Sequence, residues 1–345
     1  MRSVYLIVGI GSQLGNTVAA DLIASGETVR GLADVHEDVT MLYRSGITIV
    51  RGNLAEPRSA EPLFYGLTAR DRVYVIHCAS LVTLFTRYDR RVLEANRRYT
   101  ENLLRLCRTH SVRKLIYVSS LYPFRELAPD SVTGELAGFA PEAVVALYQD
   151  VKREVESMIL RETENGLDAT ILQTSGLIGP NDYGRGHLTQ LIIRYLDGTL
   201  TMSVDGGYDL VDVRDVSKSV IAATERGRRG ERYILSNRFV HVHEFFSSLR
   251  RISGGPKLTR LPLWIAHAIS PVVEILSVIG KRAPLYTRYA LFALRSNARL
   301  CNFKARRDLG FTVRPLSETL SDTVQFLRRE RKNLFRKRHP SAARA

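Results

Sequence analysis

A tyrosine and a lysine four residues apart offer the clearest chemistry in the chain. Tyr148 and Lys152 stand in LYQDVKREVE, inside a pattern that predicts a helix from about 141 to 165. Residues at i and i+4 share one helix face, so the phenol and the ammonium can meet at one ligand. The nearby positive charge favours the phenolate and lowers the tyrosine pKa, which suits a general acid or base.

Two hydroxyl groups stand about 28 residues upstream of this pair. Ser119 and Ser120 end IYVSS, within a predicted strand over 114–120. Their hydroxyls are placed to bind a substrate oxygen beside the tyrosine. The three residue types together therefore favour proton transfer at a hydroxyl or carbonyl group.

A glycine-rich turn follows the first predicted strand, in VYLIVGIGSQLG. The spacing G-x-G-x-x-G fails at Leu14, whereas G-x-x-G-x-x-G fits Gly9 and Gly15 and has Ser12 in the middle. Such a turn brings the backbone close to a pyrophosphate, which the following helix N-terminus stabilises. The pattern predicts a dinucleotide site, and an ordinary tight turn is the alternative.

An acidic residue follows the second predicted strand. Asp34 stands nineteen positions after Gly15, near the spacing at which a carboxylate binds the adenosine ribose. A carboxylate there repels a 2′-phosphate, which favours NAD over NADP. A plain loop role for Asp34 is the alternative, because Ala33 occupies this position in another alignment.

The elements that must position these residues alternate along the chain. Strand-like apolar runs separated by helix-length segments predict an α/β fold, a Rossmann doubly wound parallel sheet with a smaller, mostly helical C-terminal substrate lobe. We expect an NAD(P)-binding domain over 1–180, to which 208–240 return. The substrate lobe takes 181–207 and 241–327, and a flexible basic tail takes 328–345.

Charge and composition bound the location and the partners. The net charge is +15, and residues 325–345 hold eight Lys or Arg against one Glu. The apolar segment 261–280 has one polar stripe, so we expect it to cover a substrate pocket or a partner subunit, or to lie in a membrane interface. Three scattered cysteines and no signal peptide predict a cytoplasmic protein, peripheral on the inner membrane face if the tail binds lipid. No nucleic-acid partner is expected.

Further motifs occur in an order that resembles a known superfamily. The glycine turn, VIHCAS, EANRRYTENLL, IYVSS, YQDVK, LIGPND and VDVRDV resemble the extended short-chain dehydrogenase/reductases of the NAD-dependent epimerase/dehydratase type, as far as Leu327. TSGLIGPNDYGRG and GGYDLVDVRDV are most similar to its bacterial dihydroflavonol-reductase-like and 3-beta-hydroxysteroid-dehydrogenase-like branch.

The resemblance implies a role for each catalytic candidate. Tyr148 is the acid/base, Lys152 binds the nicotinamide ribose and lowers the tyrosine pKa, and Ser120 positions the substrate oxygen. Asn96, in EANRRYT, matches the asparagine of a proton relay, with a helix-surface or capping role as its alternative. The cofactor-binding residues are expected to be Gly9, Gly11, Ser12, Gln13, Leu14, Gly15, Asp34, Asn53, Leu54, Cys78, Ala79, Ser80 and Lys152.

The sequence departs from the family pattern at two cofactor positions. Ser12 replaces a glycine, and Asn53 stands where an aspartate often faces the adenine. Both bear on cofactor affinity rather than on the fold. VDVRDV, with Asp212 and Asp215, is interpreted as a structural ion-pair loop, and no metal site is predicted, because His241 and His243 lack a third ligand.

The favoured function is hydride transfer between a secondary alcohol and a ketone, on a hydrophobic small molecule, with NAD or else NADP. The alternatives are a nucleotide-sugar epimerase with tightly bound NAD and a non-catalytic dinucleotide-binding sensor. Dehydration is disfavoured, because SSLYPF lacks the Asp-Glu pair that dehydratases of the resembled superfamily usually carry after the catalytic hydroxyl residue. A homodimer is the partner that the resemblance suggests.

Overall fold

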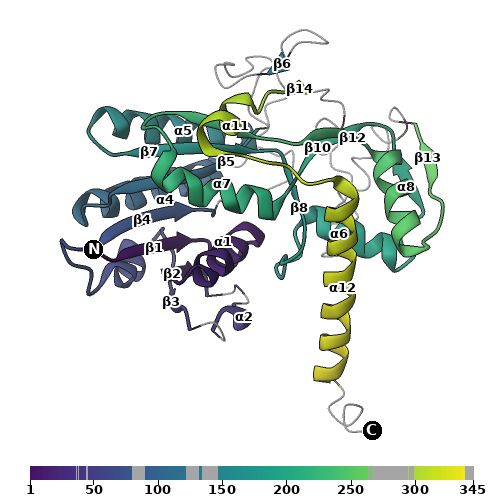
Figure 1. Cartoon of the computed structure of the whole chain (residues 1–345), viewed down its shortest axis with the longest axis horizontal. Helices are drawn as coiled ribbons and strands as arrows, with labels where there is room; N and C mark the ends of the chain where they lie inside the picture. The colour runs from purple at the N-terminus through teal and green to yellow at the C-terminus, as the bar shows by residue number, and fades with distance from the viewer. Residues whose placement is uncertain are drawn as a thin grey trace.

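The computed structural model describes residues 1–35, 37, 39–43, 46–79, 90–121, 132–133, 147–262, 265, 294 and 299–338. Strands and helices alternate through the first two thirds of the chain, and helices dominate its end (Figure 1). The elements are β1 (Ser3–Val8), α1 (Gln13–Ala24), β2 (Thr28–Ala33), α2 (Thr40–Tyr43), β3 (Thr48–Arg51), α3 (Pro57–Ala60), η1 (Glu61–Phe64), β4 (Arg72–His77), α4 (Arg90–Thr109), β5 (Lys114–Ser120), β6 (Val132–Thr133), α5 (Leu147–Glu164), β7 (Ala169–Thr174), β8 (Gly176–Ile178), α6 (His187–Leu196), β9 (Met202–Val204), β10 (Gly207–Asp212), α7 (Val213–Arg226), β11 (Arg232–Leu235), β12 (Arg238–His241), α8 (Val242–Ser253), β13 (Thr259–Leu261), β14 (Arg299–Leu300), α11 (Phe303–Leu309) and α12 (Leu316–Arg338).

The main element is a seven-stranded parallel sheet in the order β11-β7-β5-β4-β1-β2-β3. From β1 the chain first adds strands on one side, β2 and β3, and then on the other, from β4 to β11. The order therefore reverses between β1 and β4, the point where doubly wound sheets bind ligands at the carboxyl ends of their strands. The predicted Rossmann fold is confirmed.

Helices cover both faces of this sheet, which explains why its strands are nearly continuous apolar runs. In β1, Tyr5 and Ile7 belong to the core under α1, α7 and α11. Val4, Leu6 and Val8 belong to the opposite core, under α4 and α5. Both faces of the central strand are thus dry.

The C-terminal lobe has a core of its own. Residues of α6, α8 and α12 pack against β8, β10 and β12, which form a small three-stranded sheet. The sequence predicts one strand over 168–180, but the structure divides it at Ser175. β7 stays in the large sheet and β8 pairs with β10, because the chain leaves the large sheet here to enter the lobe. The segment 208–240 is divided in the same way. α7 packs on the large sheet and β11 is a strand of it, whereas β10 and β12 belong to the small sheet.

The end of the chain differs from the prediction. α12 continues through Arg338 and projects from the body (Figure 1), so residues 328–338 are helical rather than a flexible tail. The helix persists because its first half is anchored: Leu320 and Val324 are buried in the lobe core. Of the apolar segment 261–280, only 261, 262 and 265 are among the described residues, so its predicted role lies outside them.

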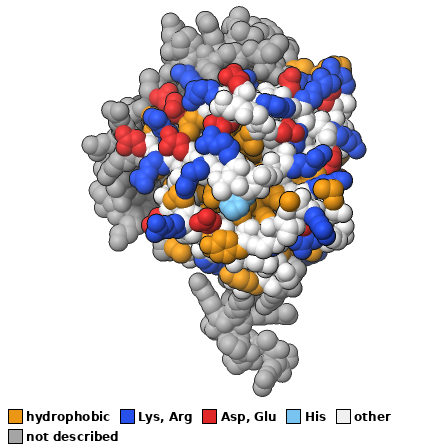
Figure 2. All heavy atoms as spheres, turned by 90° about the vertical axis from the view of Figure 1, so that its left-hand side faces the viewer, with side chains coloured by type: hydrophobic (Ala, Val, Ile, Leu, Met, Phe, Trp, Pro, Cys, Tyr) orange, Lys and Arg blue, Asp and Glu red, His pale blue; other side chains and the backbone are white. Residues whose placement is uncertain are grey.

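The surface bears on the membrane and nucleic-acid predictions. Figure 2 shows the face at the left of Figure 1, where Lys and Arg side chains are mixed with acidic and apolar ones. In the part of the chain drawn there in colour, no continuous basic stripe forms. Among the described residues, no helix has the length and apolar character needed to cross a bilayer.

Candidate active site

The glycine turn lies at the reversal of strand order. Gly9 follows β1 with φ +78°, and a Cβ there would lie 2.8 Å from the backbone nitrogen of Ala79, which follows β4. The Cys78 N–H also donates to the Val8 carbonyl at 2.9 Å. Only glycine fits this crossing, so β1 and β4 approach closely where a dinucleotide would bind.

The N-terminus of α1 faces the same turn. A Cβ on Gly15 would lie 2.3 Å from the Gly9 carbonyl oxygen, so glycine at this position lets the helix start directly on the turn. Ser12 is the N-cap, because its Oγ accepts from the Gly15 N–H at 3.0 Å and donates to the Gly9 carbonyl at 2.8 Å. The serine that departs from the glycine pattern thus supplies a helix cap.

Two other residues of the turn use their side chains elsewhere. The Gln13 amide donates to the carbonyls of Gly179 at 2.8 Å and Pro180 at 3.1 Å, which joins the turn to the loop after β8. Leu14 is buried in the core beneath α1. Their predicted cofactor contacts therefore fall to their backbone N–H groups, which open the helix.

At the end of β2, the structure brings a second carboxylate to the turn. The Asp34 backbone N–H donates to Oε2 of Glu37 at 3.2 Å, and the Glu37 carboxylate lies against Gly11. Arg51, at the end of β3, donates to the carbonyls of both Asp34 and Glu37 at 2.7 Å. Glu37 was not identified from the sequence, because it stands three residues beyond the expected position.

Asn53 and Leu54 lie beyond the end of β3, as predicted residues of the adenine side. The Asn53 side chain accepts the Ala55 N–H at 2.8 Å, which forms a local turn. Leu54 is buried, and its carbonyl accepts from the Asn102 amide of α4 at 2.7 Å. Asn53 therefore stabilises the local turn after β3, and Leu54 joins this turn to α4.

The end of β4 supplies the other wall of the turn. Cys78 and Ala79 are partly buried beside Gly9, and Ser80 lies outside the described residues. His77 is buried against Tyr117, with ring centroids 5.4 Å apart. Desolvation and then the charge of Lys152 lower its pKa to about 4, so the imidazole is neutral.

Lys152 lies below the end of β5. Its Nζ stands 5.7 Å from the centroid of the Tyr117 ring, three residues before Ser120, and only 3% of the residue is exposed. Desolvation lowers its pKa to about 8, and the charge of Glu156 opposes this shift. Tyr148 occupies the first turn of α5, and its side chain lies outside the described residues.

Glu156 stands one further turn along α5 and was not identified from the sequence. It is fully buried, accepts from the Gln173 amide at 3.1 and 3.0 Å, and pairs with Arg232 at 3.2 Å. These contacts tie α5 to β7 and β11. The i, i+4, i+8 series of Tyr148, Lys152 and Glu156 was the available signal.

The two remaining catalytic candidates lie on neighbouring elements. Ser120 ends β5 opposite Thr174 of β7, and the preceding Ser119 has a buried hydroxyl for which the described part of the chain offers no hydrogen-bond partner. Asn96 is 5% exposed on α4, and its carbonyl accepts from the Thr100 hydroxyl at 2.9 Å. Asn96 is therefore an interior residue of α4 rather than a cap.

The turn fits a dinucleotide on the structure's own evidence. At Gly9 and Gly15 a Cβ would strike backbone, so glycine there lets β1, β4 and the start of α1 pack closely, and the free N–H groups at the start of α1 can then meet a pyrophosphate at the turn. The residues that would hold NAD are the turn from Gly9 to Gly15, the end of β2, the end of β4 and Lys152. No group of three potential metal ligands gathers in the described ranges.

A family model described as the NAD dependent epimerase/dehydratase family matches residues 5–236. The chain belongs to this family. Its curated relatives include the sterol demethylase protein B of Methylococcus capsulatus, 24% identical over 94% of this chain and 98% of the relative. A candidate dihydroflavonol 4-reductase of Synechocystis is 24% identical over 94% of this chain and 95% of the relative.

Solved structures share the same fold. The UDP-glucose 4-epimerase of Thermotoga maritima superposes with a TM-score of 0.76 over 95% of this chain and 99% of that one, at 21% identity. The resemblance to extended short-chain dehydrogenase/reductases, and to their dihydroflavonol-reductase-like members, is confirmed. NAD, the predicted cofactor, is the one that the family is named for.

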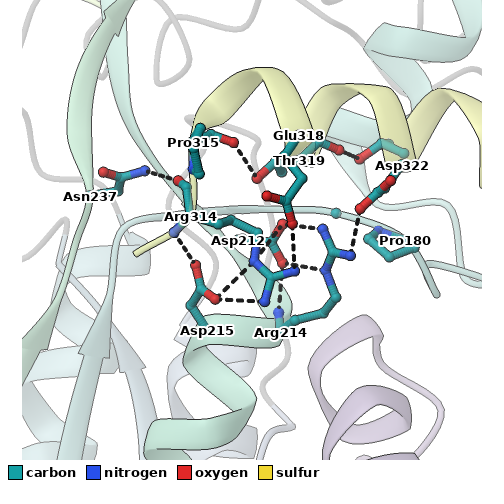
Figure 3. Close-up of polar contacts among 12 residues, drawn as sticks. Pro180, Asp212, Arg214, Asp215, Asn237, Arg314, Pro315, Glu318, Thr319 and Asp322 are labelled. Atoms are coloured by element: carbon teal, nitrogen blue, oxygen red, sulfur yellow. Dashed lines mark hydrogen bonds and ion pairs between the residues drawn. The ribbon is translucent and has the colours of Figure 1, made fainter. Parts of the chain in front are cut away.

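A buried ion-pair cluster joins this family domain to the C-terminal lobe (Figure 3). Asp212 caps α7 and binds Arg214 through both oxygens, and Arg214 reaches Asp322 of α12 at 2.6 Å. Asp215 binds Arg314, just before α12, at 2.8 Å. The predicted ion pairs of VDVRDV exist, but on a helix N-terminus rather than in a loop.

Proposed function

We propose that the chain is an NAD-dependent oxidoreductase that interconverts a secondary alcohol and a ketone on a hydrophobic small molecule. The observation that carries the proposal is Lys152, an ammonium buried below the end of β5 and four residues after Tyr148 on α5. A buried ammonium with a perturbed pKa, four residues from a tyrosine that can act as an acid or base, is typical of a catalytic site.

In the oxidation direction, Tyr148 accepts the proton of the substrate hydroxyl on its phenolate oxygen. Ser120 holds the same substrate oxygen by a hydrogen bond. The C–H bond of the carbon that carries this oxygen breaks as the C=O bond forms. When bound, NAD supplies the nicotinamide that takes up the hydride. Lys152 keeps a positive charge next to the phenolate, so the proton can be accepted near neutral pH.

The C-terminal lobe supports an apolar substrate. A cavity there lies between α6, α8 and the small sheet, and among its lining side chains are Leu188, Leu191, Leu210, Val240, Phe245 and Phe246. The described residues around it include no lysine or arginine. Because apolar burial is the main driving force available in this cavity, it favours a hydrocarbon body over a charged one.

The paired arginines favour this substrate class over a nucleotide sugar. A diphosphate is bound best by lysine or arginine side chains. At the junction of the sheet domain and the lobe, Arg214 is matched by Asp212 and Asp322, and Arg314 by Asp215, so neither guanidinium is available to a diphosphate there. An epimerase acting on a nucleotide sugar is therefore the weaker candidate.

The test compares Tyr148→Phe with the wild type. Apolar secondary alcohols, sterols among them, are supplied with NAD, and NADH formation is followed by absorbance. We expect Tyr148→Phe to lose about a thousandfold in turnover, the scale of a general acid or base, and to bind NADH as before. Tyr65→Phe is the matched control, because Tyr65 is an exposed tyrosine.

Three outcomes would contradict the proposal. Equal turnover in Tyr148→Phe and the wild type removes the tyrosine from the chemistry. NAD that stays bound through purification, with turnover of a nucleotide sugar and none of an apolar alcohol, would favour the epimerase instead. The sensor alternative requires NADH binding with no turnover of either class.

The same proposal includes a cytoplasmic location and a small-molecule partner. A homodimer and contact with an anionic membrane surface, through 261–280 and the basic end of the chain, stay predictions. The helical projection of α12 presents residues 328–338 away from the body, which is compatible with a surface contact (Figure 1). The absence of a nucleic-acid partner also stays a prediction.

A further inference from the structure

We propose that Glu37 sets the preference for NAD over NADP, by holding a carboxylate between the end of β2 and the turn residue Gly11, on the side of the turn where this fold binds the adenosine ribose. The inference rests on the proposed NAD chemistry. It concerns a residue three positions beyond Asp34, the acidic residue that spacing alone selects.

The position of the carboxylate is fixed by contacts. Glu37 Oε2 accepts the backbone N–H of Asp34 at 3.2 Å. A Cβ on Gly11 would lie 2.7 Å from Oε2 and 2.9 Å from Cδ of Glu37. The carboxylate thus fills the space that the missing side chain of Gly11 leaves open, directly over the glycine turn.

The loop that carries Glu37 is held in place from β3. Arg51 donates from Nη1 to the carbonyls of Asp34 and Glu37, each at 2.7 Å. The Glu37 N–H closes a turn onto the Asp34 carbonyl at 3.1 Å, and the Gly52 N–H binds the Ala33 carbonyl at 3.0 Å. A carboxylate on a loop braced in this way is positioned before the cofactor arrives.

The electrostatics of this position favour a hydroxyl over a phosphate. Glu37 is half-buried, and desolvation raises its pKa, while hydrogen bonds from the Asp34 and Gly11 N–H groups oppose that shift. In this fold a carboxylate at the adenosine end accepts a hydrogen bond from the ribose 2′-OH. A 2′-phosphate at the same point meets a like charge at short range, which costs binding energy.

The experiment titrates NADH and NADPH separately into the full chain and follows nicotinamide fluorescence. The variants are Glu37→Gln, which keeps the side-chain shape without the charge, and Asp34→Asn. Glu27→Gln is the control, because Glu27 lies at the opposite end of β2. Circular dichroism checks that each variant is folded.

We expect the wild type to prefer NADH. Glu37→Gln is expected to bind NADPH about tenfold more tightly, and to change NADH binding by less than about threefold. Glu27→Gln should leave both affinities unchanged.

An unchanged ratio in Glu37→Gln, together with a shifted ratio in Asp34→Asn, would return the role to Asp34 and overturn the inference. A wild type that prefers NADPH also overturns it. Failure of both nucleotides to bind overturns this inference and the proposed function together. A shifted ratio without turnover of any alcohol or ketone supports Glu37 and overturns the proposed function alone.

Discussion

At the scale of single residues, the buried charge of Lys152 lowers the free energy of unfolding. The pKa of Lys152 is lowered to about 8, chiefly by desolvation, from an ordinary value of 10.5. Between these two values the unfolded chain binds more protons than the folded one. Stability therefore rises as pH increases through this window, and the full cost is present below about pH 8.

Lys152→Met should accordingly stabilise the protein while removing its turnover. At pH 7 we expect a gain on the order of 1–3 kcal/mol in the free energy of unfolding, which shrinks towards pH 10. Urea denaturation at both pH values measures it. Lys218→Met, an exposed lysine of α7, is the control. Equal destabilisation by Lys152→Met at both pH values would contradict the argument.

Residue types and spacing predicted the site unevenly. Gly9, Gly15 and Lys152 follow from strand–turn–helix order and from i, i+4 geometry, and the structure places them around one edge of the sheet. Glu37 and Glu156 could not be identified from residue types and spacing. Glu37 lies against Gly11 on a loop whose carbonyls bind Arg51 of β3, and the partner of Glu156, Arg232, lies 76 residues away in sequence.

At the scale of elements, α1 begins where Ser12 caps it. Ser12→Ala removes the acceptor of the Gly15 N–H and should cost about 1 kcal/mol in the free energy of unfolding. Ser12→Gly, which restores the glycine pattern, should cost only a few tenths. Chemical denaturation measures both. Ser25→Ala, at the other end of α1, is the exposed control. A larger loss in Ser12→Gly than in Ser12→Ala would refute the capping role.

The order of strands and helices in the first domain could be predicted from apolar runs, because strands of a parallel sheet covered on both faces consist almost entirely of apolar residues. The division of 168–180 at Ser175 could not. β7 and β8 are both apolar, and they differ only in the strands that receive them, β5 and β11 for one and β10 for the other. Pairing of that kind depends on the whole fold.

At the scale of the molecule, the ion pairs around α7 bind the C-terminal lobe to the sheet domain. Arg314→Met leaves Asp215, 4% exposed, without its guanidinium. We expect a loss of about 3 kcal/mol in the free energy of unfolding, the scale of a broken buried pair. Urea denaturation measures the loss. Arg307→Met, an exposed arginine of α11, should change stability by less than about 0.5 kcal/mol. Equal losses in the two variants would contradict a joining role for the cluster.

The basic charge of the C-terminus was evident from composition, but its helical form was not. Composition alone favours a solvated tail, whereas α12 is nucleated by Leu316, Leu320 and Val324 in the lobe core and extends outward from there. A helix anchored at one end propagates more easily than an isolated one, because its nucleation cost is already met.

The Gln13 amide has a thermodynamic consequence. It belongs to the turn expected to hold the pyrophosphate, and it binds the carbonyls of Gly179 and Pro180 in the loop that leads to α6. α6 in turn lines the apolar cavity of the lobe. Two ligands that each shift this hydrogen-bonded contact are coupled through it. If the first ligand changes the affinity for the second by some factor, the second ligand must change the affinity for the first by the same factor.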